Sequence, residues 1–157
     1  MAGLRKDYIL TQIDLLRQFI ARLSNKREQT GLDEALQLAF HLQEKLFPLP
    51  PAEFLRLEVD RQIEELMKGA SKGDGQEKCL TYAQLLKETA TLYQFRGRDD
   101  LAAGARQLAL HVALSIALDQ PSSPEPVYAL VDELQGAVDR ENLHPPVLEL
   151  LAAYEKL

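Results

Sequence analysis

The stretch LAAGARQLALHVALSIAL, from Leu101 to Leu118, holds no acid and a single base, Arg106. On a helical wheel at 100° per residue, leucine, isoleucine and valine cover one broad arc, and alanine covers nearly all of the rest. A helix that is apolar almost all round is buried in a protein core or in a membrane. The stretch therefore predicts a central helix, and its length has to decide which of the two environments surrounds it.

Length favours the protein core. The part without formal charge runs from Gln107 to Leu118 and spans about 18 Å as a helix, whereas the hydrocarbon core of a bilayer is about 30 Å thick. Extension toward the N-terminus brings in Arg106 and then Asp99 and Asp100. We therefore expect no membrane span, and the alanine arc indicates the close approach of a neighbouring helix.

His111 stands in the middle of this apolar stretch. On the wheel it lies beside Gly104 and Ser115, with leucines on both flanks, so it points inward or to the rim of a groove. One interpretation is a neutral histidine that is hydrogen-bonded to a backbone carbonyl or a nearby tyrosine. The other is a ligand-binding or acid–base residue, because histidine titrates near neutrality. The pattern leaves both interpretations open.

The rest of the chain is also predicted to be helical. Apolar spacing, first-turn acids and prolines predict helices over about residues 5–24, 33–47, 52–68, 76–96, 101–118, 125–141 and 145–156. Gly97 is expected to end the fourth of these helices in the left-handed conformation. No segment alternates with period 2 for long, so no strand is expected. Short links imply antiparallel neighbours. The prediction is one all-α domain over residues 1–157, with a flexible link near 69–75 (GASKGDG).

Composition limits the partners. The hydrophobic content of 46% and charged content of 27% are those of a globular protein. The net charge of −6 argues against nucleic acid as the main partner. Residues 1–28 hold six bases and three acids, a net of +3, so the other residues, with 12 bases and 21 acids, carry −9. A basic first helix either packs against an acidic body or faces an anionic partner.

Cysteine usage and the N-terminus indicate a compartment. Cys79 is the single cysteine, which excludes a disulfide within the chain and a metal site made of thiols alone, and fits a reducing compartment. The first residues lack the uninterrupted apolar core of a signal peptide, because Asp7, Gln12 and Asp14 break it. A cytoplasmic location is therefore expected.

Motifs for catalysis are missing from the sequence. It contains no phosphate-binding loop, no nucleophile elbow and no zinc-protease motif. His41 and Glu44 could share a helix face, but di-iron bundles use the reverse order twice. Cys79 has no evident base beside it, and His144, before two prolines, is interpreted as an exposed cap or loop residue. We expect no catalytic residue, no cofactor and no metal.

Part of the chain resembles a tetratricopeptide repeat, a helix–turn–helix unit of about 34 residues. The matching residues are Ala90, Tyr93, Gly97, Ala102, Ala109 and Leu110. The segment 31–35 (GLDEA) resembles the same turn. Arg106 stands where an aromatic residue is usual, and the second helix is about two turns too long. The resemblance implies an irregular array of tetratricopeptide-like helical hairpins.

The resemblance also implies a role. Tetratricopeptide domains commonly bind peptides or proteins in a concave groove, and one subset grips a C-terminal carboxylate with Asn and Lys. Asn25 and Asn142 are the only asparagines, and both are expected in links, so such a clamp is not expected. The run 7–14 (DYILTQID), followed by Ile20-Ala21-Arg22, resembles the start of a family of small, functionally uncharacterised bacterial proteins, which implies no activity.

Two functions remain open. The first is a non-enzymatic helical scaffold for protein–protein interaction or self-association, from which a purely structural subunit cannot be separated by sequence. The alternative is a small-molecule-binding or enzymatic helical bundle that uses His111 in a pocket. The residues expected to line a groove are Tyr82, Tyr93, Arg96, Arg106 and His111.

Overall fold

The computed structural model describes Thr11, Asp14, Gln18 and residues 29–119 and 125–157. All regular elements in this part of the chain are helical, so the predicted all-α class is confirmed. The elements are α2 (Gln29–Leu46), α3 (Pro51–Phe54), α4 (Val59–Met67), α5 (Lys72–Phe95), α6 (Asp99–Asp119), α7 (Glu125–Ala137), the 3-10 turn η1 (Arg140–Asn142) and α8 (Pro145–Glu155). The helix predicted over 5–24 and the DYI motif lie outside the described residues, apart from Thr11, Asp14 and Gln18, which are helical.

The hairpin of α5 and α6 forms the centre of the fold, and these two helices share the most extensive contact between elements. Gly97 joins them in the left-handed conformation, with φ of 79°. The N–H of Arg98 returns to the carbonyl of Tyr93 at 2.9 Å, which satisfies a carbonyl at the end of α5. Gly97 therefore ends α5 as the sequence predicts.

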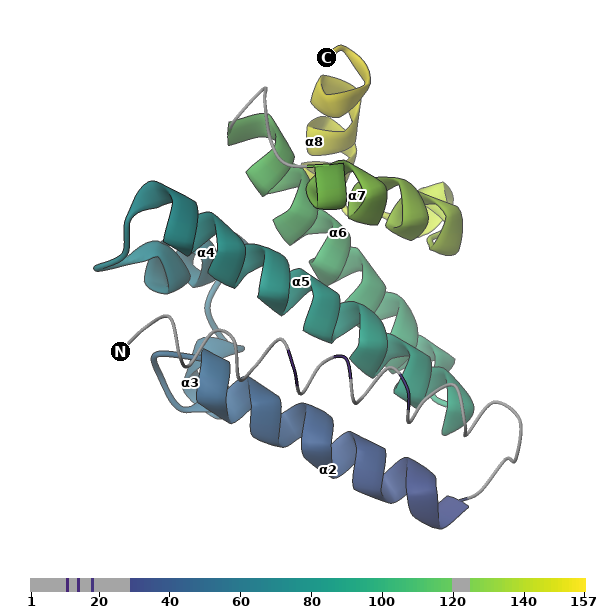
Figure 1. Ribbon diagram of the computed structural model, residues 1–157. Coiled ribbons are helices and arrows are strands. Elements are labelled where there is room, and N and C mark those ends of the chain that lie inside the picture. Colours follow the sequence, from purple (N-terminus) through teal and green to yellow (C-terminus); the bar gives the residue numbers. More distant parts are fainter. Residues whose placement is uncertain (1–10, 12–13, 15–17, 19–28, 120–124) are drawn as a thin grey trace.

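The other helices pack around this hairpin. Figure 1 shows α2 alongside α5, and α7 and α8 gathered at the other end of the molecule, against α6. One buried cluster lies around α6 and includes residues of α4, α5, α7 and α8, and a smaller one lies between α2 and α5. Because α5 is buried on both sides, its threonines bond within the helix; Thr89, for example, donates to the carbonyl of Leu85 at 2.8 Å.

The prediction of a central helix is confirmed by α6. Its buried side chains are Ala102, Ala109, Leu110, Val112, Ala113, Leu114, Ile116 and Ala117. By length and composition alone α6 could also cross a membrane, and it is the one such helix in the described part of the chain. In the structure α6 contacts α4, α5, α7 and α8, which bury most of it from Ala109 onward, whereas Leu101, Ala103 and Gly104 near its start are exposed.

The helix predicted over 52–68 is wrong in one respect, because it is two helices. The short helix α3 ends at Phe54, and α4 begins at Val59 after a turn. Phe54 is fully buried and stacks on Phe47, with ring centroids 4.0 Å apart. The turn lets Phe54 enter the core while α4 turns Gln62 and Leu66 inward.

The link predicted near 69–75 is shorter than expected. The side chain of Ser71 accepts a hydrogen bond from the N–H of Asp74 at 3.2 Å and so caps α5, which begins at Lys72. Gly73 and Gly75 therefore lie in the helix. The predicted boundary near residue 141 also moves, since α7 ends at Ala137.

Candidate functional site

A groove of about 540 Å³ opens between the start of α4, one face of α6 and the start of α8. It is lined by Glu58, Val59, Asp60, Gly104, Gln107, Leu108, His111, His144, Pro146 and Val147. Three segments far apart in the sequence therefore build one surface. His111 is one of the four lining residues that belong to the central helix α6.

The floor of the groove is a face of α6. Gly104, Leu108 and His111 follow at spacings of four and three, which places them on one side of the helix. A Cβ atom built on Gly104 would meet no heavy atom within 4 Å. Because Gly104 also lines the groove, this open space is a hollow within the groove, and Leu108 supplies apolar carbon beside it.

The α4 wall is fixed by a buried hydrogen-bond pair. Oε1 of Gln62 accepts from the hydroxyl of Tyr82 at 2.8 Å, and Nε2 of Gln62 donates to the carbonyl of Leu57 at 3.1 Å. Gln62 is nearly fully buried, so both groups need these partners. The pair ties the first turn of α4 to α5 and thereby sets where Glu58 and Asp60 stand on the rim.

The α8 wall depends on Gln107. Its Oε1 accepts from the backbone N–H of His144 at 2.6 Å. His144 is the residue before the first turn of α8, whose next two residues are prolines that offer no N–H. Gln107 thus connects α6 directly to the start of α8. The prediction that His144 is an exposed cap residue is confirmed.

His111 faces Asp60 across the groove. Its Nε2 atom lies 3.8 Å from Oδ1 of Asp60, beyond hydrogen-bond range but close enough for an ion pair when the imidazole is protonated. The side chain of His111 is 14% exposed and that of Asp60 is 85% exposed. Burial lowers the pKa of His111, and the charge of Asp60 offsets part of that effect. His111 is therefore at the edge of a groove rather than enclosed by leucines.

The lining carries negative charge on an apolar base. The lining residues include the carboxylates of Glu58 and Asp60 and no Lys or Arg. Four residues, Val59, Leu108, Pro146 and Val147, give it apolar surface. The described residues contain no group of three or more His, Cys, Asp or Glu side chains placed to hold a metal ion. The arrangement can hold an apolar group next to a cation.

The prediction that Tyr82 lines a groove is wrong. Tyr82 is fully buried, with the edges of its ring against Phe47 and Phe54 at centroid distances of 5.3 and 5.6 Å. Burial raises the pKa of its hydroxyl. Tyr82 shares a helix face with Tyr93, but the α3–α4 segment covers that face at Tyr82. The spacing of residues along α5 does not indicate that another segment packs there.

The other predicted groove residues have separate neighbours. The ring centroid of Tyr93 lies 6.5 Å from that of Phe40 on α2. Arg96 forms an ion pair with Asp33 of α2. Arg106 donates to Oε1 of Gln94 at 2.6 Å, across the α5–α6 hairpin. None of these three is among the residues that line the groove at His111. Of the five predicted residues, the structure places His111 alone in it.

Sequence reasoning missed Glu58, Asp60 and Gln107. Gln107 stands four residues before His111, so the wheel of α6 could have identified it. Glu58 and Asp60 could not be found in this way, because the position of α4 depends on the contact between Gln62 and Tyr82.

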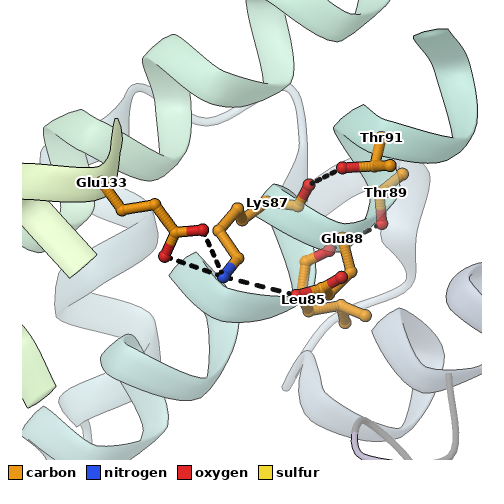
Figure 2. Close-up of polar contacts among 6 residues, drawn as sticks. All are labelled: Leu85, Lys87, Glu88, Thr89, Thr91 and Glu133. Atoms are coloured by element: carbon orange, nitrogen blue, oxygen red, sulfur yellow. Dashed lines mark hydrogen bonds and ion pairs between the residues drawn. The ribbon is translucent and has the colours of Figure 1, made fainter. Parts of the chain in front are cut away.

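A second hollow, of about 360 Å³, lies between α5 and α7. Figure 2 shows the Nζ atom of Lys87 between two carboxylates. It lies 3.1 Å from both carboxylate oxygens of Glu133 and 3.5 Å from Oε1 of Glu88. The single positive charge of Lys87 attracts both carboxylates and joins α5 to α7, so this cluster stabilises the packing of the two helices.

Cys79 is a buried residue of α5. Burial raises the pKa of its thiol to about 12, so the reactive thiolate is scarce at neutral pH. This burial supports the interpretation of Cys79 as an inert core residue.

Comparison with known proteins gives no match: no protein-family model, no curated protein and no solved structure is similar to this chain at a significant level. The groove at His111 therefore has to be interpreted from its own geometry.

Proposed function

We propose that the protein is a non-enzymatic helical interaction module that binds a segment of a partner protein in the groove at His111. The observation that carries this proposal is the open hollow above Gly104, which is bounded by three helices and whose exposed surface is mostly apolar. Peptide-binding grooves combine apolar surface with a few polar groups that set orientation. The cytoplasmic location expected from the sequence belongs to the same proposal.

The tetratricopeptide-like interpretation remains part of the proposal. Two features support it. Gly97 forms the left-handed turn between α5 and α6, and Ala90, Ala102 and Ala109 are buried where the resemblance expects small residues between paired helices. The site proposed here, however, lies at α4, α6 and α8 rather than along the face of Tyr82 and Tyr93.

A small-molecule-binding or enzymatic role is the second candidate, and the His111–Asp60 pair favours it. A histidine beside a carboxylate is a common arrangement for a general base. The lining residues, however, include no Ser, Thr, Cys, Tyr or Lys that this base could activate. The nearby hydroxyl of Ser115 donates to the backbone carbonyl of His111 at 2.9 Å. Binding without chemistry is therefore the better account.

The test uses two matched glycine variants and a displayed library of random 12-residue peptides. Gly104→Leu fills the hollow, whereas Gly136→Leu places the same side chain in open space on α7. We expect the unmodified protein to select peptides that bind the Gly136→Leu variant equally well and lose about tenfold or more in affinity for Gly104→Leu. If no selected peptide distinguishes the two variants, the proposal is wrong.

Self-association through the same groove, with a second copy as the partner, is an alternative to this proposal and has a test of its own. Sedimentation of the unmodified protein and of both variants tests it. A dimer that Gly104→Leu dissociates and Gly136→Leu leaves intact would identify the groove as the contact between copies.

A further inference from the structure

We infer that the segment bound in the groove is cationic and partly apolar: a Lys or Arg side chain held by Glu58 and Asp60, next to an apolar side chain in the hollow above Gly104. This inference rests on the proposed function and names the chemistry of the partner.

Charge complementarity is the first argument. Both carboxylates of the groove stand on the α4 wall, and none of the lining residues is a Lys or Arg that could neutralise them. The facing group is His111, whose pKa burial lowers, so near neutral pH it adds little positive charge. The nearby cation Arg61 is engaged by Glu64 at 3.5 Å. A bound cation would therefore meet two carboxylates without a competing base in the lining.

The net charge of the chain outside residues 1–28 also favours a cationic partner. Outside residues 1–28 the chain carries 12 bases and 21 acids, a net charge of −9. Summed surface charge attracts partners of the opposite sign and raises their association rate. An acidic segment would be repelled both by this charge and by Glu58 and Asp60.

Shape is the second argument. Lys and Arg have long apolar stems below the charged head. A stem lying on Leu108 and Val59 would bring its head to the α4 wall, where the exposed side chains of Glu58 and Asp60 also line the groove. The hollow above Gly104, with Pro146 and Val147 on the α8 side, then remains for a neighbouring apolar side chain.

The experiment extends the peptide selection. Among peptides that bind the unmodified protein and Gly136→Leu but not Gly104→Leu, we expect a positive mean charge and Lys or Arg close to Leu, Ile, Val or Met. The best such peptide is then synthesised, and its dissociation constant is measured at low and high salt. We expect binding to weaken about fivefold or more between 50 and 300 mM salt, because screening reduces the attraction.

Charge variants locate the effect. Glu58→Gln with Asp60→Asn should weaken binding of this peptide by about tenfold or more. The control, Glu34→Gln with Glu44→Gln, removes two exposed acids of α2 and changes the net charge equally, so it should change binding by less than about twofold.

The outcomes separate the two proposals. Groove-dependent peptides that are neutral or acidic, or that bind the Glu58→Gln, Asp60→Asn variant as tightly as the unmodified protein, would overturn the cationic partner and leave the interaction groove standing. Absence of any groove-dependent peptide would overturn both.

Discussion

The hydroxyl of Tyr82 donates a buried hydrogen bond of 2.8 Å to Oε1 of Gln62 and so joins α5 to α4. The same glutamine donates to the carbonyl of Leu57, just before the groove acids. One buried amide therefore connects the aromatic core of the protein with the α4 wall of the groove.

The first prediction concerns this bond. Tyr82→Phe should lower the free energy of unfolding by about 1–3 kcal/mol, because it leaves a buried carbonyl oxygen of Gln62 without its donor. Urea denaturation measures the change. Tyr154→Phe is the control: its exposed hydroxyl lies 3.4 Å from Asp132. This variant should change stability by less than about 0.5 kcal/mol. Equal stabilities for the two variants would show that the Tyr82 bond contributes little.

The second prediction is a pH dependence at His111. Burial holds the pKa of His111 below its ordinary value of 6.5, so the unfolded chain takes up this proton more readily than the folded one. The contribution of neutral His111 to the free energy of unfolding is thus fully present above about pH 6.5. It is lost as the pH falls toward the lower pKa that His111 has in the folded chain. Stability measured from pH 8 down to pH 5 should fall less for His111→Gln than for the unmodified protein.

Asp60→Asn gives the opposite change. The charge of Asp60 raises the pKa of His111 in the folded chain. It thereby reduces the difference between the pKa of His111 in the folded chain and its pKa in the unfolded chain. Removing this charge should make the acid-induced loss of stability larger. Superimposable pH profiles for His111→Gln and the unmodified protein would contradict the effect of burial.

The third prediction separates four glycines. Gly104→Ala and Gly136→Ala should each raise stability by up to about 1 kcal/mol, since alanine favours a helix and neither new methyl group meets an atom within 4 Å. Gly75→Ala should not, because its Cβ would come within 3.0–3.2 Å of Met67. Gly97→Ala should lower stability by about 1–2 kcal/mol, because its φ is 79°. Thermal unfolding of the four variants gives the order of their stabilities. A Gly75→Ala variant that is more stable than the unmodified protein would contradict the tight contact of α5 with α4.

The fourth prediction concerns Cys79. With its thiol buried and its pKa raised to about 12, the native protein at pH 8 should react with a colorimetric thiol reagent only as fast as the chain opens. The same protein in concentrated urea should react at once with one thiol. Immediate reaction of the native protein would show that Cys79 is accessible.

Prediction from the sequence succeeded where local pattern is sufficient. The stretch from Leu101 to Leu118 could be identified as a central helix, because a helix that is apolar almost all round needs neighbours on most of its sides. The left-handed turn at Gly97 followed from its place between two helices. Both features depend on residues close together in the chain.

Prediction failed where the outcome depends on contacts between distant segments. No glycine or proline lies between Leu55 and Glu58 to indicate that α3 and α4 separate there. The break exists because Phe54 has to reach Phe47 and Tyr82 in the core. The same packing removes Tyr82 from the surface and brings Asp60 to His111, so the wrong prediction for Tyr82 and the failure to predict Asp60 have a common cause.

The groove at His111 exists only when α4, α6 and α8 are all in place, because each supplies part of its lining. A segment that contacts all three binds the folded chain and not the unfolded one. At a free concentration of 100 times its dissociation constant, such a segment stabilises the fold by about 2.7 kcal/mol. A cell that produces the partner in excess would therefore protect this protein from proteolysis, and the steady-state amounts of the two would rise and fall together.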